Sequence, residues 1–406
     1  MRATVEEGDL VMERLFIGGK VFDGGGTLLD GHGVMVREGR IAEVAPADRF
    51  AGFTGVRVDT TGATLLPGLI DCHVHLVYEG EPNPSVSMMQ MGPGQIVMRA
   101  LANAQMTLAK GTTAIRDCGG KDFLEFAVRD ACNSGRQLGP TIMASGKVIC
   151  MTGGHGNRNG RVADGVDEVI KAVREQIHAG SDLIKIMATG GVMTPGVNPE
   201  DAHYSAEEMA AGIHEGHRFH RTCASHAQGA EGILNAVRGG VDSIEHGIFM
   251  DAECIDEMLA HGTYLVPTLA AVKNIVAFKD QGVPDYVVEK AMRVEERHRQ
   301  SVVDFYRAGG RIAMGTDAGT PFNFHGANAR ELEYMVEIGI SAADALTIST
   351  GNGADLMQNA AIGEIAAGKA ADLLIVEGDP LADILMVADP VNHRQVVKNG
   401  VIVPPA

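Results

Sequence analysis

The sequence predicts an α/β protein: a (β/α)₈ barrel of the TIM type together with a small composite β-sandwich domain made from both ends of the chain. Short apolar runs alternate with amphipathic stretches of helical period from Leu65 to about Met357. Both flanks are rich in short β-type segments and glycine turns. The 406 residues suffice for one large and one small domain, and we place the parts at 1–64, 65–356 and 357–406.

The central region contains a series of strand candidates, most of them followed by an amphipathic stretch, as a barrel requires. These strands are Leu65–Ile70, Thr113–Asp117, Thr141–Ile149, Leu183–Met187, Cys223–His226, Ser243–His246, Tyr264–Pro267 and Arg311–Asp317. Helical periodicity is clear at 164–179, 205–220 and 285–308, and Ser205-Ala-Glu-Glu208 is a capping box that marks a helix start. An open doubly wound sheet is the alternative fold, but no Gly-x-Gly-x-x-Gly follows the first strand.

The two flanks are expected to pair with each other, because the termini of a domain often lie close together. Residues 13–64 hold short strand candidates separated by turns such as Asp23-Gly-Gly-Gly26. After Met357 the pattern is again β-type, and Asn399-Gly400 is a strong hairpin signal. The prediction is one small β domain composed of both ends.

Composition argues against several classes of function. The net charge of −18 argues against binding to nucleic acid or to anionic membrane surfaces. No run approaches the ~18 apolar residues of a membrane span, and the stretch Met1–Asp9 is acidic without an apolar core, unlike a secretory signal. The 6 cysteines show no Cys-x-x-Cys spacing, which favours buried, reduced thiols in a cytoplasmic protein.

Ionisable side chains recur at the carboxyl ends of the predicted strands, where barrel active sites lie. His73 and His75 follow the first strand, and on extended chain their imidazoles point to the same side. The later strand ends hold Lys185, His226, His246 and Asp317. Neutral imidazole is the commonest metal ligand in proteins. The sequence therefore predicts a metal site at the mouth of the barrel.

Lys185 is the unusual member of this set, in Asp182-Leu-Ile-Lys-Ile-Met187. An ammonium group does not ligate a metal ion, and its burial among cations is costly. A deprotonated lysine can instead add carbon dioxide and become a carbamate, an anionic oxygen ligand able to bridge two metal ions. The alternative is a lysine that pairs with Asp182 or points out of the barrel.

These residues resemble the amidohydrolase superfamily in its binuclear form with a carboxylated lysine, and the resemblance covers essentially the whole chain. The matching motifs are Pro67-Gly-Leu-Ile-Asp-Cys-His-Val-His75, Ile184-Lys-Ile186, Ala224-Ser-His-Ala227, Ile244-Glu-His-Gly247 and Gly315-Thr-Asp-Ala318. The resemblance implies two divalent metal ions, one held by His73, His75 and Asp317, the other by His226 and His246, with a carbamate on Lys185 as the bridge.

Histidine and oxygen ligands suit zinc, with manganese, cobalt and iron as alternatives. The resemblance further implies hydrolysis of an amide bond by a hydroxide that bridges the two ions. In this scheme Asp317 is the catalytic residue, because it takes the proton of the hydroxide and passes it to the leaving amine.

Two loops resemble the imidazolonepropionase-like subgroup, which includes Xaa-Pro dipeptidases and carboxypeptidases. The glycine-rich loop Met151–Gly160 contains His155 and Arg158, and Tyr204 precedes a predicted helix. The resemblance implies that His155 and Tyr204 bind the terminal α-carboxylate of the substrate, with Arg158 in support. His325 is expected to line the mouth of the barrel. The predicted substrate is a dipeptide or an N-acyl amino acid, and the product is a free C-terminal amino acid.

Other functions remain to be weighed. Hydrolysis of a cyclic amide, as in imidazolonepropionase, stays open. A mononuclear deaminase is disfavoured, because such enzymes carry a glutamate beside the strand-5 histidine where this chain has Ser225-His-Ala227. A non-enzymatic assembly protein of this fold is disfavoured because such relatives lose ligands. His214, His217 and His220 lie along one predicted helix face away from the strand ends, so they are expected to be solvated or packed. We expect a homo-oligomer with a small-molecule substrate.

Overall fold

The computed structural model describes residues 13–405, so the stretch Met1–Asp9 discussed above lies outside the described residues. The chain divides into two compact units. The first comprises the residues up to Ile70, Met106–Ala114 and those from Gly326 onward, and the second comprises Asp71–Gln105 and Ile115–His325. Helices and four sheets make it an α/β protein. Within residues 13–405, none of the helices combines the length and apolar character that crossing a membrane requires.

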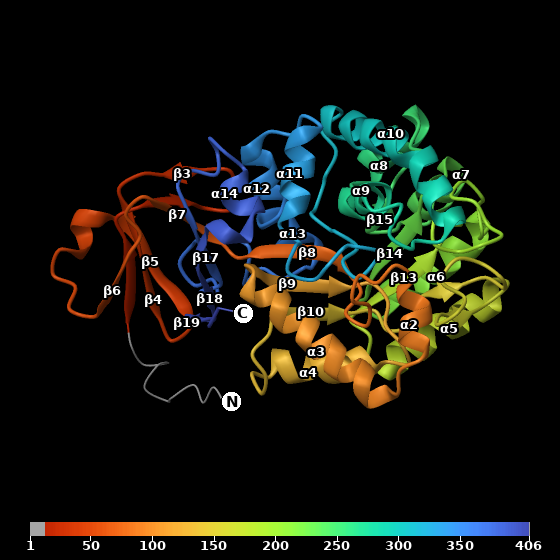
Figure 1. Ribbon diagram of the computed structural model, residues 1–406, viewed down its shortest axis with the longest axis horizontal. Coiled ribbons are helices and arrows are strands. Elements are labelled where there is room, and N and C mark those ends of the chain that lie inside the picture. Colours follow the sequence, from red (N-terminus) through yellow and green to blue (C-terminus); the bar gives the residue numbers. More distant parts are fainter. Residues whose placement is uncertain (1–12, 406) are drawn as a thin grey trace. The chain divides into compact units, whose positions relative to one another are not determined.

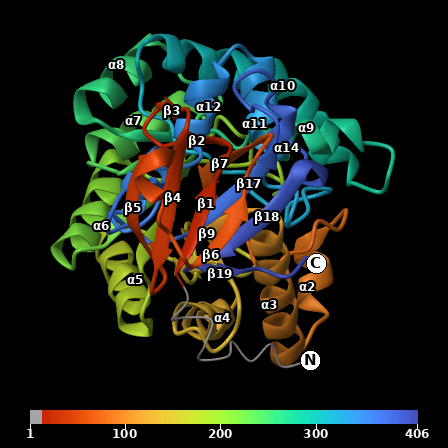
Figure 2. The same cartoon turned by 90° about the vertical axis from the view of Figure 1, so that its left-hand side faces the viewer.

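The first unit contains two sheets. One has the order β5-β4-β1-β6 and consists of β1 (Arg14–Ile17), β4 (His32–Arg37), β5 (Arg40–Pro46) and β6 (Val56–Asp59). The other has the order β19-β18-β17-β7-β2-β3 and consists of β2 (Lys20–Phe22), β3 (Leu28–Leu29), β7 (Ala63–Pro67), β17 (Leu373–Glu377), β18 (His393–Lys398) and β19 (Val401–Ile402). Strands β7 and β17 lie side by side and antiparallel (Figure 2). Strands from both flanks of the chain therefore share one sheet.

Local chemistry accounts for the end of this second sheet. The predicted hairpin at Asn399-Gly400 is confirmed, because Lys398 of β18 pairs with Val401 of β19. Both turn residues have positive φ, 48° for Asn399 and 75° for Gly400, as a two-residue hairpin turn of type I′ needs. The short helices of this unit are η1 (Ala47–Phe50), α11 (Arg330–Glu337), α12 (Ala342–Ile348), α13 (Gly351–Leu356), α14 (Leu385–Ala388) and η2 (Pro390–Asn392).

Two further sheets lie mostly in the second unit, although β8 and β9 each begin in residues of the first. A three-stranded sheet has the order β10-β9-β8, with β8 (Leu69–Val74), β9 (Thr112–Asp117) and β10 (Thr141–Ala144). A six-stranded parallel sheet has the order β12-β11-β13-β14-β15-β16, with β11 (Ile149–Cys150), β12 (Arg161–Val162), β13 (Leu183–Met187), β14 (Thr222–Ala227), β15 (Ser243–His246) and β16 (Tyr264–Val266). Every residue of β13, β14 and β15 is buried, as expected for parallel strands covered on both faces.

Helices surround these strands (Figure 1). They are α2 (Pro84–Met89), α3 (Pro93–Ala109), α4 (Leu124–Asn133), α5 (Val166–Ala179), α6 (Ala206–Arg218), α7 (Ala230–Arg238), α8 (Ala252–His261), α9 (Leu269–Ala277) and α10 (Asp285–Arg307). The capping box predicted at the start of α6 is confirmed, because the Ser205 side chain accepts from the Glu208 backbone and the Glu208 side chain accepts from the Ser205 backbone.

Two predicted strands are each divided in the structure. The stretch predicted at Leu65–Ile70 belongs to β7 and β8, which Gly68 separates. A β-carbon on Gly68 would lie 2.2 Å from the Thr113 side chain, so the chain passes there only without one. The stretch predicted at Thr141–Ile149 forms β10 and the start of β11, interrupted by Gly146 with φ 76°.

The last predicted strand, Arg311–Asp317, is an irregular extended segment instead of a continuous strand. Its backbone still forms hydrogen bonds with β16 on one side and β8 on the other. The Ala313 amide donates to the Leu265 carbonyl of β16, and the Asp317 amide donates to the His73 carbonyl of β8. A β-carbon on Gly315 would lie 2.2 Å from Val266, and Asp317 has φ 61°. This close approach and the left-handed turn interrupt the regular pairing while they hold Asp317 beside His73.

Candidate metal centre and active site

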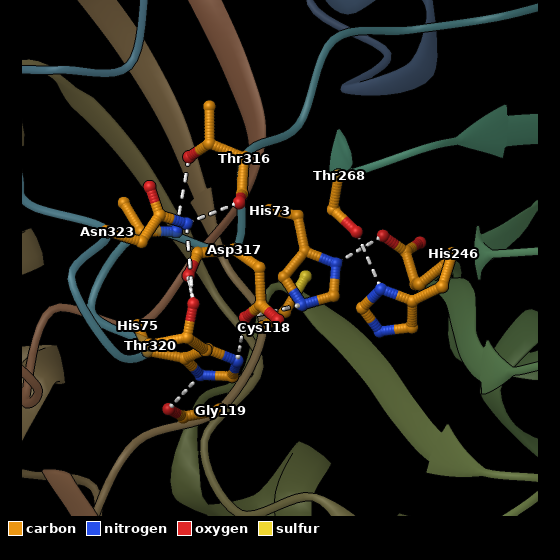
Figure 3. Close-up of polar contacts among 12 residues, drawn as sticks. His73, His75, Cys118, Gly119, His246, Thr268, Thr316, Asp317, Thr320 and Asn323 are labelled. Atoms are coloured by element: carbon orange, nitrogen blue, oxygen red, sulfur yellow. Dashed lines mark hydrogen bonds and ion pairs between the residues drawn. The ribbon is translucent and has the colours of Figure 1, made fainter. Parts of the chain in front are cut away.

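The six side chains predicted as metal ligands come together in one cavity of the second unit. They are His73 of β8 and His75 after it, Lys185 of β13, His226 of β14, His246 of β15 and Asp317. Oδ1 of Asp317 lies 3.2 Å from Nε2 of His75 and 3.6 Å from Nε2 of His73. The ring of His246 lies 5.2 Å from that of His73 and 4.6 Å from that of His226 (Figure 3 shows His73, His75, His246 and Asp317).

One ring nitrogen of each histidine is held by a partner outside the ligand set. Nδ1 of His73 donates to Oε2 of Glu245 at 2.6 Å. Nδ1 of His75 donates to the Gly119 carbonyl at 2.8 Å, and Nε2 of His226 donates to the Gly190 carbonyl at 2.9 Å. Because carboxylates and carbonyls only accept, each of these nitrogens carries the proton of a neutral imidazole. In the neutral ring the other nitrogen therefore presents a lone pair.

His246 is held in a similar way. Its Nδ1 lies 2.6 Å from Oγ1 of Thr268, which leaves Nε2 as the second nitrogen of the ring (Figure 3). Burial lowers the pKa of His73, His226 and His246 well below the ordinary value, and the charge of Lys185 lowers it further. These three rings are therefore neutral at physiological pH, the form that binds metal ions.

The lone pairs and the Asp317 carboxylate face one another at short distances, and such acceptors repel unless a proton or a cation lies between them. Burial disfavours a proton on His75, but the hydrogen bond and the charge of Asp317 outweigh burial and raise the pKa of this imidazole. Ligand atoms of His73, His246 and Asp317 all lie within 4.8 Å of one another. Imidazole nitrogens with a carboxylate oxygen are a donor set that divalent ions such as zinc accept. The residues present thus fit a metal centre.

The backbone is left-handed at three positions of this centre. His246 has φ 74°, Thr268 φ 54° and Asp317 φ 61°, a conformation that is uncommon outside glycine and concentrates at functional sites. At His246 the geometric consequence is clear. Neighbouring side chains of a regular strand point to opposite faces, yet Glu245 and His246 both reach His73.

Sequence reasoning missed the residues that support His73. Oε1 of Glu245 accepts from Nη2 of Arg116 at 2.7 Å and from Oγ of Ser243 at 2.6 Å, and all three residues are buried. The signal was present in the sequence, because Arg116 directly follows Ala114-Ile115 in a predicted strand, and a charge buried there needs a partner.

A family model described as the amidohydrolase family matches residues 64–403. The chain belongs to the amidohydrolase family. The resemblance drawn from the motifs is thereby confirmed, and so is the expectation of a hydrolase that acts on amide bonds.

Several proteins of known identity are similar to this amidohydrolase. Ochratoxinase of Aspergillus niger is 30% identical over 416 residues, which cover 92% of this chain and 85% of that enzyme. The crystal structure of a Xaa-Pro dipeptidase with bound methionine in its active site has a TM-score of 0.89 and 32% identity, covering 96% of this chain and 99% of that one. A prolidase complexed with N-methylphosphonate-L-proline has the same TM-score, identity and coverage.

Two of the four predicted substrate-binding residues line the cavity of the amidohydrolase. His155 and Arg158 do so, and the His155 ring lies 4.4 Å from that of His226. Nδ1 of His155 is 2.8 Å from Oγ1 of Thr194. Burial, together with the charges of His203 and Lys185, lowers the pKa of His155 to about 3. A β-carbon on Gly191 would lie 2.7 Å from this ring, so the ring packs there because residue 191 is glycine.

Tyr204 and His325 are not among the residues that line this cavity. Tyr204 is 2% exposed, and its hydroxyl donates to the Ala163 carbonyl. Nε2 of His325 lies 3.2 Å from the His75 carbonyl and 3.1 Å from the Tyr78 carbonyl, so His325 supports the chain that follows β8. Their positions in sequence suggested the mouth, but their hydrogen bonds hold both side chains to the backbone.

Proposed function

We propose that this amidohydrolase is a metal-dependent enzyme that hydrolyses a peptide or N-acyl amide bond and releases a free C-terminal amino acid. One observation carries the proposal. The Nδ1 atoms of His73 and His75 are held by a carboxylate and a carbonyl acceptor, and the Nε2 atoms of both rings face the carboxylate of Asp317. The ochratoxinase and dipeptidase names of its relatives support the same class of bond.

Two divalent ions, zinc by the chemistry of the donor set, would occupy this centre. His73, His75 and Asp317 would hold the first, His226 and His246 the second, with a carbamate on Lys185 as the shared ligand. When bound, the two ions supply an acidified water as nucleophile and polarise the scissile carbonyl. The carbamate is supported by the position of Lys185, which is 1% exposed and lies with its Nζ 3.5 Å from Nε2 of His73. An ammonium beside metal ions is costly, whereas an anionic carbamate would be attracted to them.

The proposed catalytic residue is Asp317. Its carboxylate receives the proton of the attacking water and delivers it to the leaving nitrogen. The backbone bond from Asp317 to the His73 carbonyl and the left-handed turn at Asp317 hold this carboxylate in place. In hydrolysis the acyl carbon gains the hydroxyl group, the C–N bond breaks and the nitrogen gains the proton.

His155 and Arg158 are the proposed binding residues for the α-carboxylate of the substrate. Both line the cavity, and Arg158 offers a planar pair of donors suited to a carboxylate. His155, neutral at physiological pH, can donate one hydrogen bond. We do not carry Tyr204 and His325 into this proposed site, because their polar atoms are used by the backbone.

The proposal extends to the architecture. We propose that the sheets of the second unit close into a (β/α)₈ barrel through the segment 311–318, supported by its backbone bonds to β16 and β8. The sequence boundaries 1–64, 65–356 and 357–406 are proposed for a barrel flanked by the two parts of one β domain. A homo-oligomer in the cytoplasm is also proposed, the compartment supported by the buried thiols.

The test combines elemental analysis of the purified protein with hydrolysis of dipeptides, N-acyl amino acids and cyclic amides. We expect about two metal ions per chain and release of a free amino acid. Lys185→Met should lower the metal content and reduce kcat by about 10³-fold or more, because it removes the shared ligand. The matched control is Lys171→Met, an exposed lysine of α5, which should leave both unchanged.

Two outcomes would contradict this proposal. Full metal content and activity in Lys185→Met would show that the lysine is not a ligand. Two bound metal ions together with turnover of cyclic amides alone would support the metal centre and show that the reaction is the hydrolysis of a cyclic amide.

A further inference from the structure

The charged side chains lining the cavity are few. Among the described residues they are Arg158, Lys185 and Asp317. Asp317 and Lys185 belong to the proposed metal-ligand set, Lys185 as a carbamate, so Arg158 is the charged lining side chain that remains outside that set. A substrate group with a positive charge would therefore meet cationic and neutral groups on the rest of the wall. Burial of an ammonium without a counter-charge is costly.

One wall of the cavity is apolar. It is formed by Ala271, Val272 and Ile275 of α9 together with Val192 and Met193. Val192, Val272 and Ile275 also belong to a buried cluster that packs against α10, so this wall is backed by core. Such a surface binds uncharged hydrocarbon groups and supplies neither a counter-charge nor a strong hydrogen-bond acceptor for an ammonium group.

Gln228 supplies a neutral polar group beside the proposed ligands. It follows His226 by two residues, lines the cavity and is 4% exposed. Its backbone is fixed on both sides, because its amide donates to Oγ1 of Thr189 and its carbonyl accepts from the Phe249 amide. The buried Oε1 of Gln228 has no hydrogen-bond partner in the part of the chain that the structure describes. A buried acceptor left unpaired costs ~1–3 kcal/mol, and a ligand N–H would remove that cost.

We propose, on the basis of the function proposed above, that the substrate is an N-acyl amino acid with an uncharged, largely apolar acyl group and without a free amino group. Gln228 is then the specificity-determining residue, because its neutral amide oxygen can accept from the N–H of the scissile amide but supplies no counter-charge for an ammonium. Water adds across the amide bond, and the products are a carboxylic acid and an amino acid.

The test uses two substrates that differ in one group. L-Phenylalanyl-L-phenylalanine carries an α-amino group, and 3-phenylpropanoyl-L-phenylalanine is the same molecule without it. At pH 6.5 we expect kcat/KM for the phenylpropanoyl compound to exceed that for the dipeptide by about tenfold or more, the cost of an unmatched buried charge. The ratio should fall as pH rises through ~8, where the α-amino group loses its proton.

Gln228→Glu adds a carboxylate to the wall. We expect it to shift the ratio of the two kcat/KM values by about tenfold toward the dipeptide at pH 6.5. The matched control is Gln137→Glu, an exposed position outside the cavity, which should leave the ratio unchanged. If Gln228→Glu does not fold, the ratio of the two kcat/KM values in the wild-type enzyme and its pH dependence still test the inference.

Equal or faster cleavage of the dipeptide by the wild-type enzyme at pH 6.5 would overturn the inference and leave the proposed amide hydrolysis intact. Cleavage of neither compound, nor of any N-acyl amino acid in a wider series, would remove the proposed function and the inference with it. An unchanged ratio in a folded Gln228→Glu variant would overturn the role of Gln228.

Discussion

Glu245 links two parts of the site that are far apart in sequence. One carboxylate oxygen accepts from His73, and the other accepts from Arg116 and Ser243. The Arg116 guanidinium also donates to the Cys72 carbonyl through Nε. A charged pair buried this deeply is stable only while both members are present. Glu245 thus fixes the orientation of His73 and neutralises Arg116 together.

At the scale of this residue we predict that Glu245→Gln is severely destabilising. It leaves the Arg116 charge without a buried partner, which typically costs ~3–5 kcal/mol. Because the His73 ring loses its anionic acceptor, metal affinity should fall by about 10–100-fold. Chemical denaturation and metal titration measure the two effects. The control is Glu296→Gln at an exposed position of α10, and an equal effect of both variants would contradict the role of Glu245.

The helix α10 positions a loop of the cavity. Lys290 on this helix donates from Nζ to the carbonyls of Thr194 at 2.7 Å and Val197 at 2.6 Å. Tyr286, one turn earlier, donates to the Met193 carbonyl. Thr194 in turn contacts His155, so a helix outside the reacting centre sets the position of the proposed carboxylate-binding residue.

At the scale of the element we predict that Lys290→Met raises KM by about tenfold with a smaller change in kcat. The variant removes charge-assisted hydrogen bonds worth ~1–3 kcal/mol from a loop that carries no reacting group. Steady-state kinetics with an N-acyl amino acid measure the split between KM and kcat. Lys279→Met, an exposed lysine between α9 and α10, is the control. A fall in kcat at constant KM would show that the loop acts on the chemical step instead.

The stability of the whole molecule depends on buried carboxyl groups as well as on apolar packing. Glu125 of α4 is fully buried, and a β-carbon on Gly120 would lie 1.9 Å from its carboxyl group. Burial, together with the nearby charge of Asp117, raises the pKa of Glu125 to about 8. The folded state therefore holds this proton at pH values where the unfolded chain, with an ordinary pKa of 4.5, has lost it.

At the scale of the whole molecule we predict that the contribution of Glu125 to the free energy of unfolding decreases as pH rises. The contribution of this group is complete below pH 4.5 and is lost as pH rises toward 8, since the unfolded chain releases the proton first. Glu125→Gln mimics the protonated form. Its free energy of unfolding should therefore exceed that of the wild type by more than about 1 kcal/mol at pH 8.5 and equal it near pH 4.5. Denaturation curves across this range measure the difference, and a constant offset at all pH values would contradict the assignment.

Long-range pairing organises the first unit. Strand β7 pairs with β17, so residues near 65 lie beside residues near 375. Asp372 and Lys398 form a buried ion pair at 2.6 Å, and the Asn399 amide donates to the same carboxylate. The sequence predicted that the two flanks pair, yet the register and this ion pair are properties of the assembled sheet.

Local pattern was enough to identify the metal-ligand candidates. Strand period and strand polarity place His73, Lys185, His226 and His246 at strand ends or on one face, and these are short-range properties of the chain. The capping box at Ser205 and the hairpin at Asn399-Gly400 were predictable for the same reason, because each depends on a few neighbouring residues.

Tertiary structure alone decided the partners of those residues. Glu245 reaches His73 across 172 positions of sequence, and Arg116 reaches Glu245 across 129. Tyr204 looked suited to the cavity, but its hydroxyl donates to the backbone of Ala163. The physical reason is that periodicity shows which face of an element a side chain occupies, whereas contacts between distant elements depend on how those elements pack and on backbone turns such as that at His246.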